Sequence, residues 1–298
     1  QPDAIAVQQI NGVDYVITAN EGDAREWGDF VEEIRVKDLI KSANASFTDD
    51  APKDLKELAG GAILNTATFA YCGASALSPG ECRNDPVLGR LNVTWAQGYQ
   101  RNPDGTPKLY LSSGLLAPDG TAKAETRLMY DNLYSFGARS MSVFAGNTGA
   151  LVWDSGDFIE QYTGGDLCMA GVLRDTLCKS FFNSGHNKVA IDDRSDNKGP
   201  EPEGLVLGQI GSKTFAFLGL ERMGGVMAFD VSDPTKPIFQ DYLNSRDFNV
   251  TTLSAASGDL GAEGLAFIPS ALSPTGKPLV VTGHEVSGTT SVYEVVGQ

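Results

Sequence analysis

The sequence predicts an all-β protein, namely a β-propeller built from four-stranded blades. Three observations lead to this prediction: a short motif recurs three times, an apolar strand ending in glutamate follows each copy, and convincing amphipathic helices are few. The acids of the second and third copies, at positions 203 and 263, lie 60 residues apart. A four-stranded unit that repeats as a whole is typical of propeller blades and not of a sandwich.

The repeated motif places an acid after a proline or a small residue, and the acid is followed by a small residue and two aliphatic residues. Its copies are PDAIA at 2–6, PEGLV at 202–206 and AEGLA at 262–266. The apolar strands behind them span 15–21, 215–221 and 279–285, so that the glutamate lies 18, 18 and 22 residues after the acid. Each copy therefore predicts the two inner strands of one blade.

Outer strands are expected behind these repeats, at 225–231, 238–242 and 291–295. Residues 140–144 and 151–153 are predicted to form a further hairpin around an Asn-Thr-Gly turn. Helices are expected only at 30–41 and 52–58, inside a long insertion. The prediction is therefore a single propeller portion over 1–298, with insertion-rich regions at 28–70 and 72–135 between blades.

About four blades are expected in this chain, whereas closed propellers more often carry more. An open ring would expose sheet edges and core, which natural proteins avoid. We therefore expect the remaining blades to come from the same precursor or from a second chain. No signal peptide precedes the first motif, and Gln1 is accordingly interpreted as a mature or truncated start.

The composition describes a soluble acidic protein with 38 acidic and 23 basic side chains and a net charge of −15. Such a surface repels nucleic acid and anionic lipid, and it attracts cations. No segment approaches the roughly 20 consecutive apolar residues that a membrane span needs. The sequence predicts no nucleic-acid binding and no membrane span, and simple solubility is the plainer alternative explanation of the charge.

The four cysteines form two pairs with equal spacing, Cys72 with Cys82 and Cys168 with Cys178. Neither pair has the spacing of a zinc knuckle or a redox motif, so two small disulfide-closed loops are predicted, with four unrelated thiols as the alternative. Disulfides imply an oxidising compartment, and the protein is expected to be secreted or displayed at the cell surface. Glycosylation sequons at Asn44, Asn92 and Asn249 agree with this location.

Equivalent positions of propeller blades lie at one height around the axis, so the repeated acids are expected to meet. Asp3, Glu203 and Glu263 open the innermost strands, and Glu21, Glu221 and Glu285 end the next ones. In an antiparallel pair these two positions lie at the same end. Crowded carboxylates repel one another unless a cation compensates, and calcium, which takes six to eight oxygens, is the predicted cofactor.

An acidic loop at 192–203 adds further oxygen ligands to this predicted metal site, namely Asp196, Asn197 and Glu201. The alternative is a structural salt network without metal, in which Arg25, Arg194 and Arg222 pair with the acids. Both arrangements can hold at once. Other chemistries are poorly supplied, because the chain has two histidines and no G-x-S-x-G nucleophile motif.

Four segments carry a resemblance to a known family: YVITANEGDARE at 15–26, YSFGARS at 134–140, RSDNKGPEPEG at 194–204 and NSRDF at 244–248. The chain resembles the choice-of-anchor I family. That family includes a mesenchyme-specific cell-surface glycoprotein linked to biomineralisation and bacterial secreted proteins labelled alkaline phosphatases. The resemblance runs nearly end to end and covers only the C-terminal part of those longer proteins. It implies an extracellular propeller.

The leading functional hypothesis is a non-enzymatic, glycosylated calcium-binding module that presents an acidic surface to matrix, mineral or neighbouring chains, with an adhesive role. The alternative is a calcium-dependent phosphoesterase, alkaline-phosphatase-like or phytase-like, in which bound calcium activates a water. The three arginines named above would then bind the phosphate oxygens. A third hypothesis, a carbohydrate-binding module, depends on Trp27, Trp95 and Trp153 as aromatic platforms. The sequence assigns no catalytic residue.

Overall fold

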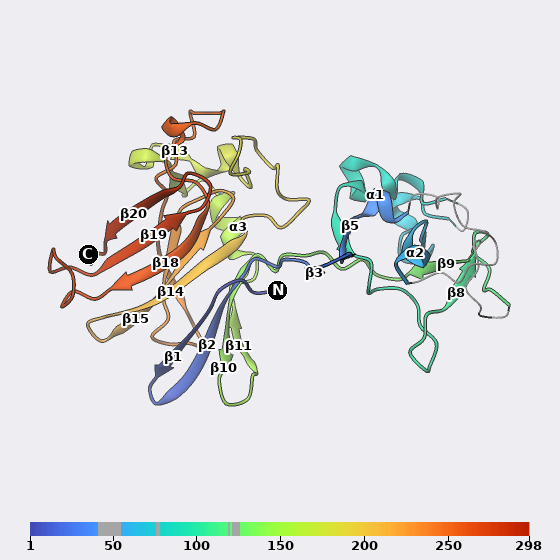
Figure 1. Ribbon diagram of the computed structural model, residues 1–298, viewed down its shortest axis with the longest axis horizontal. Helices are drawn as coiled ribbons and strands as arrows, with labels where there is room; N and C mark the ends of the chain where they lie inside the picture. Colours follow the sequence, from blue (N-terminus) through green and yellow to red (C-terminus); the bar gives the residue numbers. More distant parts are fainter. Residues whose placement is uncertain (41–54, 76–77, 119, 121–125, 298) are drawn as a thin grey trace. The chain divides into compact units, whose positions relative to one another are not determined.

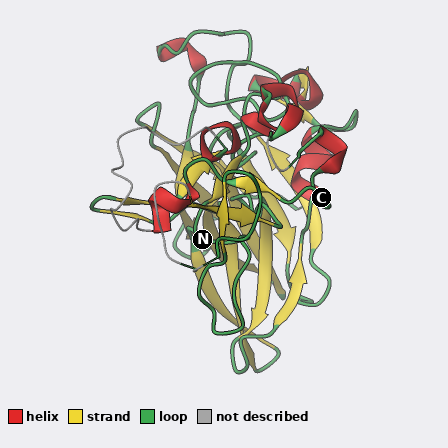
Figure 2. Ribbon diagram, turned by 90° about the vertical axis from the view of Figure 1, so that its right-hand side faces the viewer, coloured by secondary structure: helices red, strands yellow, loops and turns green. Residues whose placement is uncertain are grey.

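The computed structural model describes residues 1–40, 55–75, 78–118, 120 and 126–297 of the chain. The chain divides into two compact units, one formed by Gln1–Asp23 with Gly137–Gln298 and the other by Ala24–Phe136. Antiparallel sheets dominate, and the helices are short (Figure 2). The all-β prediction is therefore confirmed. Among the described residues, no helix is long and apolar enough to cross a membrane.

The first sheet of the larger unit has the strand order β1-β2-β10-β11 (Figure 1). Its strands are β1 (Ile5–Ile10), β2 (Val13–Asn20), β10 (Ser140–Ala145) and β11 (Leu151–Asp154). The predicted hairpin at 140–153 is confirmed as β10 and β11, and β10 pairs with β2, from Ser140 opposite Asn20 to Ala145 opposite Tyr15. The smaller unit is thus an insertion between the second and third strands of this sheet.

The second and third sheets follow the repeats found in the sequence. The second is β14 (Pro202–Ile210), β15 (Lys213–Leu220), β16 (Val226–Asp230) and β17 (Ile238–Leu243), paired in that order. The third is β18 (Ala262–Ile268), β19 (Leu279–His284) and β20 (Thr289–Glu294). The described residues therefore form three sheets of this kind, where about four blades were predicted. The difference arises because the hairpin at 140–153 completes the first sheet. None of the sheets closes on itself.

The second sheet lies between the other two, and its strand β15 is buried on both faces. Ala216, Leu218 and Leu220 of β15 belong to the main core, which also contains Ile17 and Met141 of the first sheet. The alternate residue Phe217 packs instead in a smaller cluster with Val280 of β19 and with Phe267 of β18. Because both faces are covered, β15 is apolar at nearly every position.

Two bulges and a glycine bring the repeated acids close together. The pairing of β14 with β15 shifts register between Pro202 and Leu205, and the pairing of β18 with β19 shifts between Ala262 and Gly264. Each bulge holds the glutamate of the repeat. A Cβ at Gly204 would lie 2.1 Å from the carbonyl oxygen of Glu263, so only glycine allows this approach of β14 to β18.

The insertion leaves and rejoins the first sheet through two touching glycines. Gly22 has a φ of +81°, and a Cβ there would lie 2.0 Å from the Cα of Gly137. The backbone NH of Gly137 also donates to the carbonyl of Gly22 at 3.1 Å. This close approach allows β2 and β10 to pair despite the long insertion between them in the sequence.

The smaller unit, which contains both regions predicted to be insertion-rich, has short elements around its own core. Its elements are β3 (Glu26–Trp27), β4 (Phe30–Val31), β5 (Glu33–Arg35), α1 (Val36–Leu39), α2 (Leu55–Ala59), β6 (Ile63–Leu64), η1 (Ala70–Cys72), η2 (Gly80–Arg83), η3 (Asp85–Gly89), β7 (Asn92–Thr94), β8 (Leu109–Leu111) and β9 (Thr126–Tyr130). The helix predicted at 30–41 is wrong over half its length, because 30–31 and 33–35 pair as β4 and β5. The helix at 52–58 is confirmed from residue 55 onward, and its first three residues lie outside the described residues.

The remaining short elements of the larger unit lie between the first and second sheets in sequence and before the third. They are α3 (Phe158–Thr163), β12 (Met169–Ala170), η4 (Val172–Arg174), β13 (Thr176–Leu177), η5 (Cys178–Phe181) and η6 (Ala255–Ser257). Ile159 of α3 and the hairpin of β12 and β13 contribute to the main core.

Both predicted disulfides are present, Cys72–Cys82 in the smaller unit and Cys168–Cys178 in the larger one.

Replacing Cys168 and Cys178 together by alanine is expected to lower the free energy of unfolding by about 2.5 kcal/mol, because the ten-residue loop is no longer closed in the unfolded chain. Urea denaturation measures the difference. An unchanged midpoint, or crossed pairing in peptide mapping without reduction, would contradict the assignment.

Candidate metal site at the strand ends

Equivalent strand ends of the three sheets bring carboxylates together in the larger unit. We call this group the strand-end cluster, and it comprises the six acids of the repeats, Asp3, Glu21, Glu203, Glu221, Glu263 and Glu285. Electrostatic interaction joins Glu203 to each of the other five. Glu21 and Glu221 are only 6% and 3% exposed. The structure therefore brings these six carboxylates into one region of the larger unit.

Beside the strand-end cluster, the fully buried Glu201 is neutralised by cations of the chain itself. Arg194 Nη2 lies 2.6 Å from Glu201 Oε1, and Arg222 Nε lies 2.9 Å from Oε2. Lys198 Nζ is 3.2 Å from Oε2, and it also pairs with Glu21 and with Asp23. These cations hold the pKa of Glu201 at about 2, well below its usual 4.5, although burial opposes them. Of the three arginines of the predicted salt network, Arg194 and Arg222 therefore pair with Glu201, and Arg25 does not.

Glu201 also has a strained backbone, because its φ of +52° lies in the left-handed region. Such a conformation costs on the order of 1–2 kcal/mol for a residue with a Cβ. The residue lies between Pro200 and Pro202, which fix their own φ angles. Strain of this kind persists only where the surroundings determine the conformation, and here three ion pairs do so.

Within the strand-end cluster, the carboxylates around Glu203 have less compensation by cations. Oxygens of Asp3, Glu21 and Glu203 all lie within 4.8 Å of one another. Glu203 Oε2 is buried and has no hydrogen-bond partner. Burial and the neighbouring carboxylates raise the pKa of Glu203 to about 8. Burial likewise raises the pKa of Glu21, although Lys198 partly offsets it.

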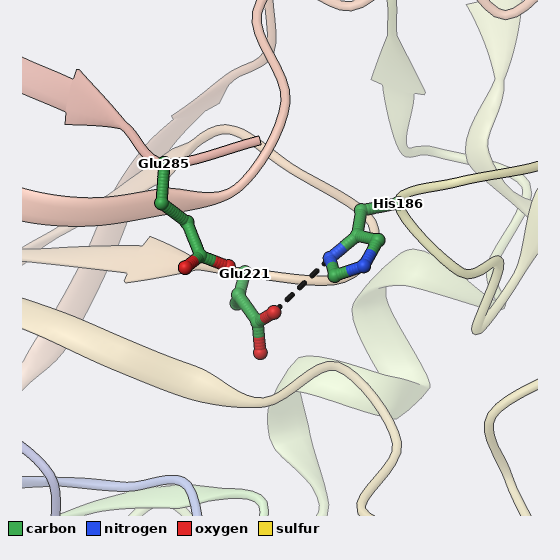
Figure 3. Close-up of side chains that lie close together, drawn as sticks. All are labelled: His186, Glu221 and Glu285. Carbon is green, nitrogen blue, oxygen red and sulfur yellow. Dashed lines mark ion pairs between the residues drawn. The ribbon is translucent and has the colours of Figure 1, made fainter. Parts of the chain in front are cut away.

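A third group joins His186 to Glu221 and Glu285, which point toward one another from a loop and from the ends of β15 and β19 (Figure 3). His186 Nδ1 lies 3.0 Å from Glu221 Oε1. Arg222 Nη1 lies 2.9 Å from both of these atoms. Burial and Arg222 lower the pKa of His186, so that the imidazole is neutral near pH 7. The guanidinium of Arg222 therefore already lies among these side chains.

Two arginines, the buried Arg246 and the half-buried Arg139, hold the loops of the cluster in place, and both were missed as functional candidates. Arg246 is 2% exposed and donates to the carbonyls of Gly185, Lys188 and Arg222, which joins the His186 loop to the turn after β15. Arg139 donates to the carbonyls of Ser195 and Asn197 and pairs with Glu160 at 2.9 Å.

The sequence contained a signal for these two arginines and for Lys198. Arg139, Lys198 and Arg246 all lie inside the segments that carry the family resemblance. These basic residues were not predicted to belong to the site, because an isolated basic residue in a loop is usually solvated.

Several predicted site residues lie elsewhere. Arg25 belongs to the smaller unit and makes a bidentate ion pair with Glu32, at 2.7 and 3.0 Å. Asp196 and Asn197 lie half-buried in the acidic loop, and Asn197 Oδ1 is buried without a hydrogen-bond partner.

The predicted glycosylation sites differ in their exposure. Asn249 is exposed, Asn92 is buried in β7 with its amide donating to Glu33, and Asn44 lies outside the described residues. Among the tryptophans, Trp27 is 58% exposed, whereas Trp95 is buried and Trp153 packs against the main core.

Comparison with known proteins agrees with the resemblance noted in the sequence. The family profile of the choice-of-anchor I domain matches residues 1–234, which is more than half of the chain. The chain belongs to the choice-of-anchor I family. A curated relative, Gigasin-3a of Magallana gigas, is 28% identical over 221 residues, which cover 72% of this chain and 67% of the relative. Family membership and two disulfides together indicate a secreted or cell-surface module.

Proposed function

We propose that this choice-of-anchor I protein is an extracellular calcium-binding module, with one calcium ion held by Asp3, Glu21 and Glu203. The observation that carries the proposal is the buried oxygen of Glu203, which has no hydrogen-bond partner and lies among other carboxylates. A buried carboxylate oxygen without a partner costs free energy unless a proton or a cation satisfies it. In this proposal the three stacked sheets are blades of a propeller, and the acidic end faces matrix, mineral or neighbouring chains.

The donor set fits calcium better than other common metals. Two oxygens bound to one calcium at about 2.4 Å each can lie at most about 4.8 Å apart, and the three carboxylates meet that limit. All the donors are hard oxygens, with no thiolate or imidazole among them, which disfavours zinc and copper. Asp3 is exposed, so water can complete the coordination of the ion.

The calcium-dependent phosphoesterase receives less support from the same residues. Of the three arginines predicted to bind phosphate, Arg194 and Arg222 are engaged with Glu201, and Arg25 pairs with Glu32 in the smaller unit. Phosphate would have to displace a carboxylate that is fully buried. We therefore propose binding without turnover.

Calcium is expected to raise the melting temperature of the chelator-treated protein at pH 8. A ligand at 100 times its dissociation constant stabilises the folded state by about 2.7 kcal/mol, which corresponds to roughly 5 °C or more. Glu203→Gln removes one ligand charge and is expected to abolish most of this shift. Differential scanning fluorimetry with and without calcium measures both.

The matched control is Glu263→Gln, which removes the same charge at the equivalent bulge of the next repeat. Glu263 is exposed and lies outside the three-carboxylate group, so this variant is expected to keep most of the calcium shift. Equal loss in both variants would mean that calcium only screens a diffuse negative field. Calcium-dependent hydrolysis of a phosphate ester that Glu203→Gln abolishes would favour the phosphoesterase instead.

A further inference from the structure

Glu21 belongs to two groups of carboxylates at once. One of its oxygens lies within 4.8 Å of oxygens of Asp3 and Glu203, the other two ligands of the proposed calcium ion. An oxygen of Glu21 also lies within 4.8 Å of oxygens of Glu201 and Glu221, a group that is buried throughout. A cation of the chain that pairs with Glu21 from this second group therefore shares a ligand with the calcium ion.

Lys198 is such a cation. Its Nζ pairs with Glu21, and it also lies 2.7 Å from Asp23 Oδ1 and 3.2 Å from Glu201 Oε2. Its side chain is only 10% exposed, so solvent and salt screen its charge from Glu21 less than they would at the surface. A lysine is an ammonium at neutral pH. Lys198 therefore places a permanent positive charge against one ligand of the proposed ion.

The backbone around Lys198 is held in place, which fixes where this charge can lie. Arg139 donates to the carbonyls of Ser195 and Asn197, in the turn immediately before Lys198. Gly137 packs against the residue itself, since a Cβ at Gly137 would lie 3.0 Å from the Cα of Lys198. The ammonium can therefore leave Glu21 only by rotation of its own side chain, within reach of its other two carboxylate partners.

We propose that Lys198 is a built-in competitor of calcium for Glu21 and that it sets the calcium affinity of the site. Without calcium its ammonium neutralises Glu21, and calcium binding releases it to Asp23 and Glu201 alone. The competition is expected to place the dissociation constant in the range of extracellular calcium modules, about 10⁻⁴–10⁻³ M. The inference rests on the proposed calcium site and concerns what regulates it.

Lys198→Met is expected to tighten calcium binding by the full chain about tenfold, measured by titration calorimetry at pH 8, because repulsion between a single and a double positive charge about 5 to 6 Å apart corresponds to this factor even at the dielectric constant of water. Lys198→Arg keeps the charge and should bind calcium nearly as the wild type does. The matched control is Lys213→Met, which removes the same charge where β15 begins, at its ion pair with Asp230. It should leave the affinity unchanged.

Lysine acetylation of the wild-type chain tests the competition without any substitution. Limiting reagent is added with and without saturating calcium, and each lysine is quantified by mass spectrometry of peptides. We expect calcium to raise the labelling of Lys198 severalfold, because its Nζ loses one of three carboxylate partners. Lys213 is the internal reference and should not change. This measurement decides the matter if Lys198→Met does not fold.

The outcomes separate this inference from the calcium site itself. Equal affinity of wild type and Lys198→Met, or labelling that calcium leaves unchanged, would overturn the inference and leave the site in place. Equally tightened binding in Lys213→Met would show that only the net charge matters, which also contradicts a role for Lys198. Calcium binding by Lys198→Met but not by the wild type would support the competition and contradict the proposed function. No binding by any of these proteins would overturn both.

Discussion

Glu201→Gln is expected to lower the free energy of unfolding by about 4 kcal/mol, the largest effect of any single substitution in the strand-end region. The substitution removes a buried anion and leaves Lys198, Arg194 and Arg222 without their shared partner. Breaking a buried ion pair from one side typically costs 3–5 kcal/mol, because the remaining charge stays desolvated. The strained backbone at position 201 would also lose the contacts that maintain it.

Urea denaturation of wild type and variant measures this difference. The matched control is Glu294→Gln, whose ion pair with Lys277 is exposed on both sides and should contribute little. Acid titration of the wild type offers a second readout. Because folding lowers the pKa of Glu201 from 4.5 to about 2, its contribution should disappear as the pH falls from 4.5 towards 2. Equal stability of the two variants would show that solvent satisfies the cations.

Without calcium, the folded protein is expected to lose about 3 kcal/mol of stability between pH 5 and pH 8. The pKa of Glu203 rises from 4.5 in the unfolded chain to about 8 in the folded one, so over this range the folded state binds more protons than the unfolded state. The free energy of unfolding therefore falls as the pH rises. The full shift would correspond to about 5 kcal/mol, and the partial exposure of the group reduces this.

Calcium reverses this trend, because the ion binds the deprotonated carboxylates and replaces the proton. Unfolding measured from pH 5 to pH 8 should therefore show a decline in chelator and little decline in saturating calcium. Glu203→Gln should decline less in chelator than the wild type, since its amide does not titrate, while the buried Glu21 and Glu221, whose pKa values burial also raises, keep part of the decline. A wild-type decline that calcium leaves unchanged would mean that the ion binds elsewhere or not at all.

The sequence predicted the strands well because their signals are local. The apolar runs at 215–221 and 279–285 are buried strands flanked by turns, and both repeat units appear in the structure as expected. The hairpin at 140–153 was also found from its turn residues. Its partner was not, because β10 pairs with β2 across an insertion of 113 residues, Ala24–Phe136, and pairing at that distance leaves no local pattern.

The sequence predicted which acids form the candidate site. It did not predict that Glu201 is paired with cations while Glu203 lies among other carboxylates. The repeats indicated which carboxylates meet, since equivalent positions of equivalent sheets lie together. Which acid would have cations was not predictable: Arg194, Lys198 and Arg222 pair with Glu201, whereas the charged groups that act on Glu203 are carboxylates. Lys198 lies inside a segment that carries the family resemblance, but no local pattern indicates that it pairs with Glu21, 177 residues away.

A crystal structure at saturating calcium and pH 8 tests the central claim most directly. The account predicts one ion bound by oxygens of Asp3, Glu21 and Glu203 at 2.3–2.6 Å, with water completing six to eight ligands. The Glu201 network should remain as it is, with Arg194 and Arg222 still paired to that carboxylate. If no ion lies among these three side chains and Glu203 hydrogen-bonds as a neutral acid to a neighbouring carboxylate, the metal site does not exist and the cluster is purely structural.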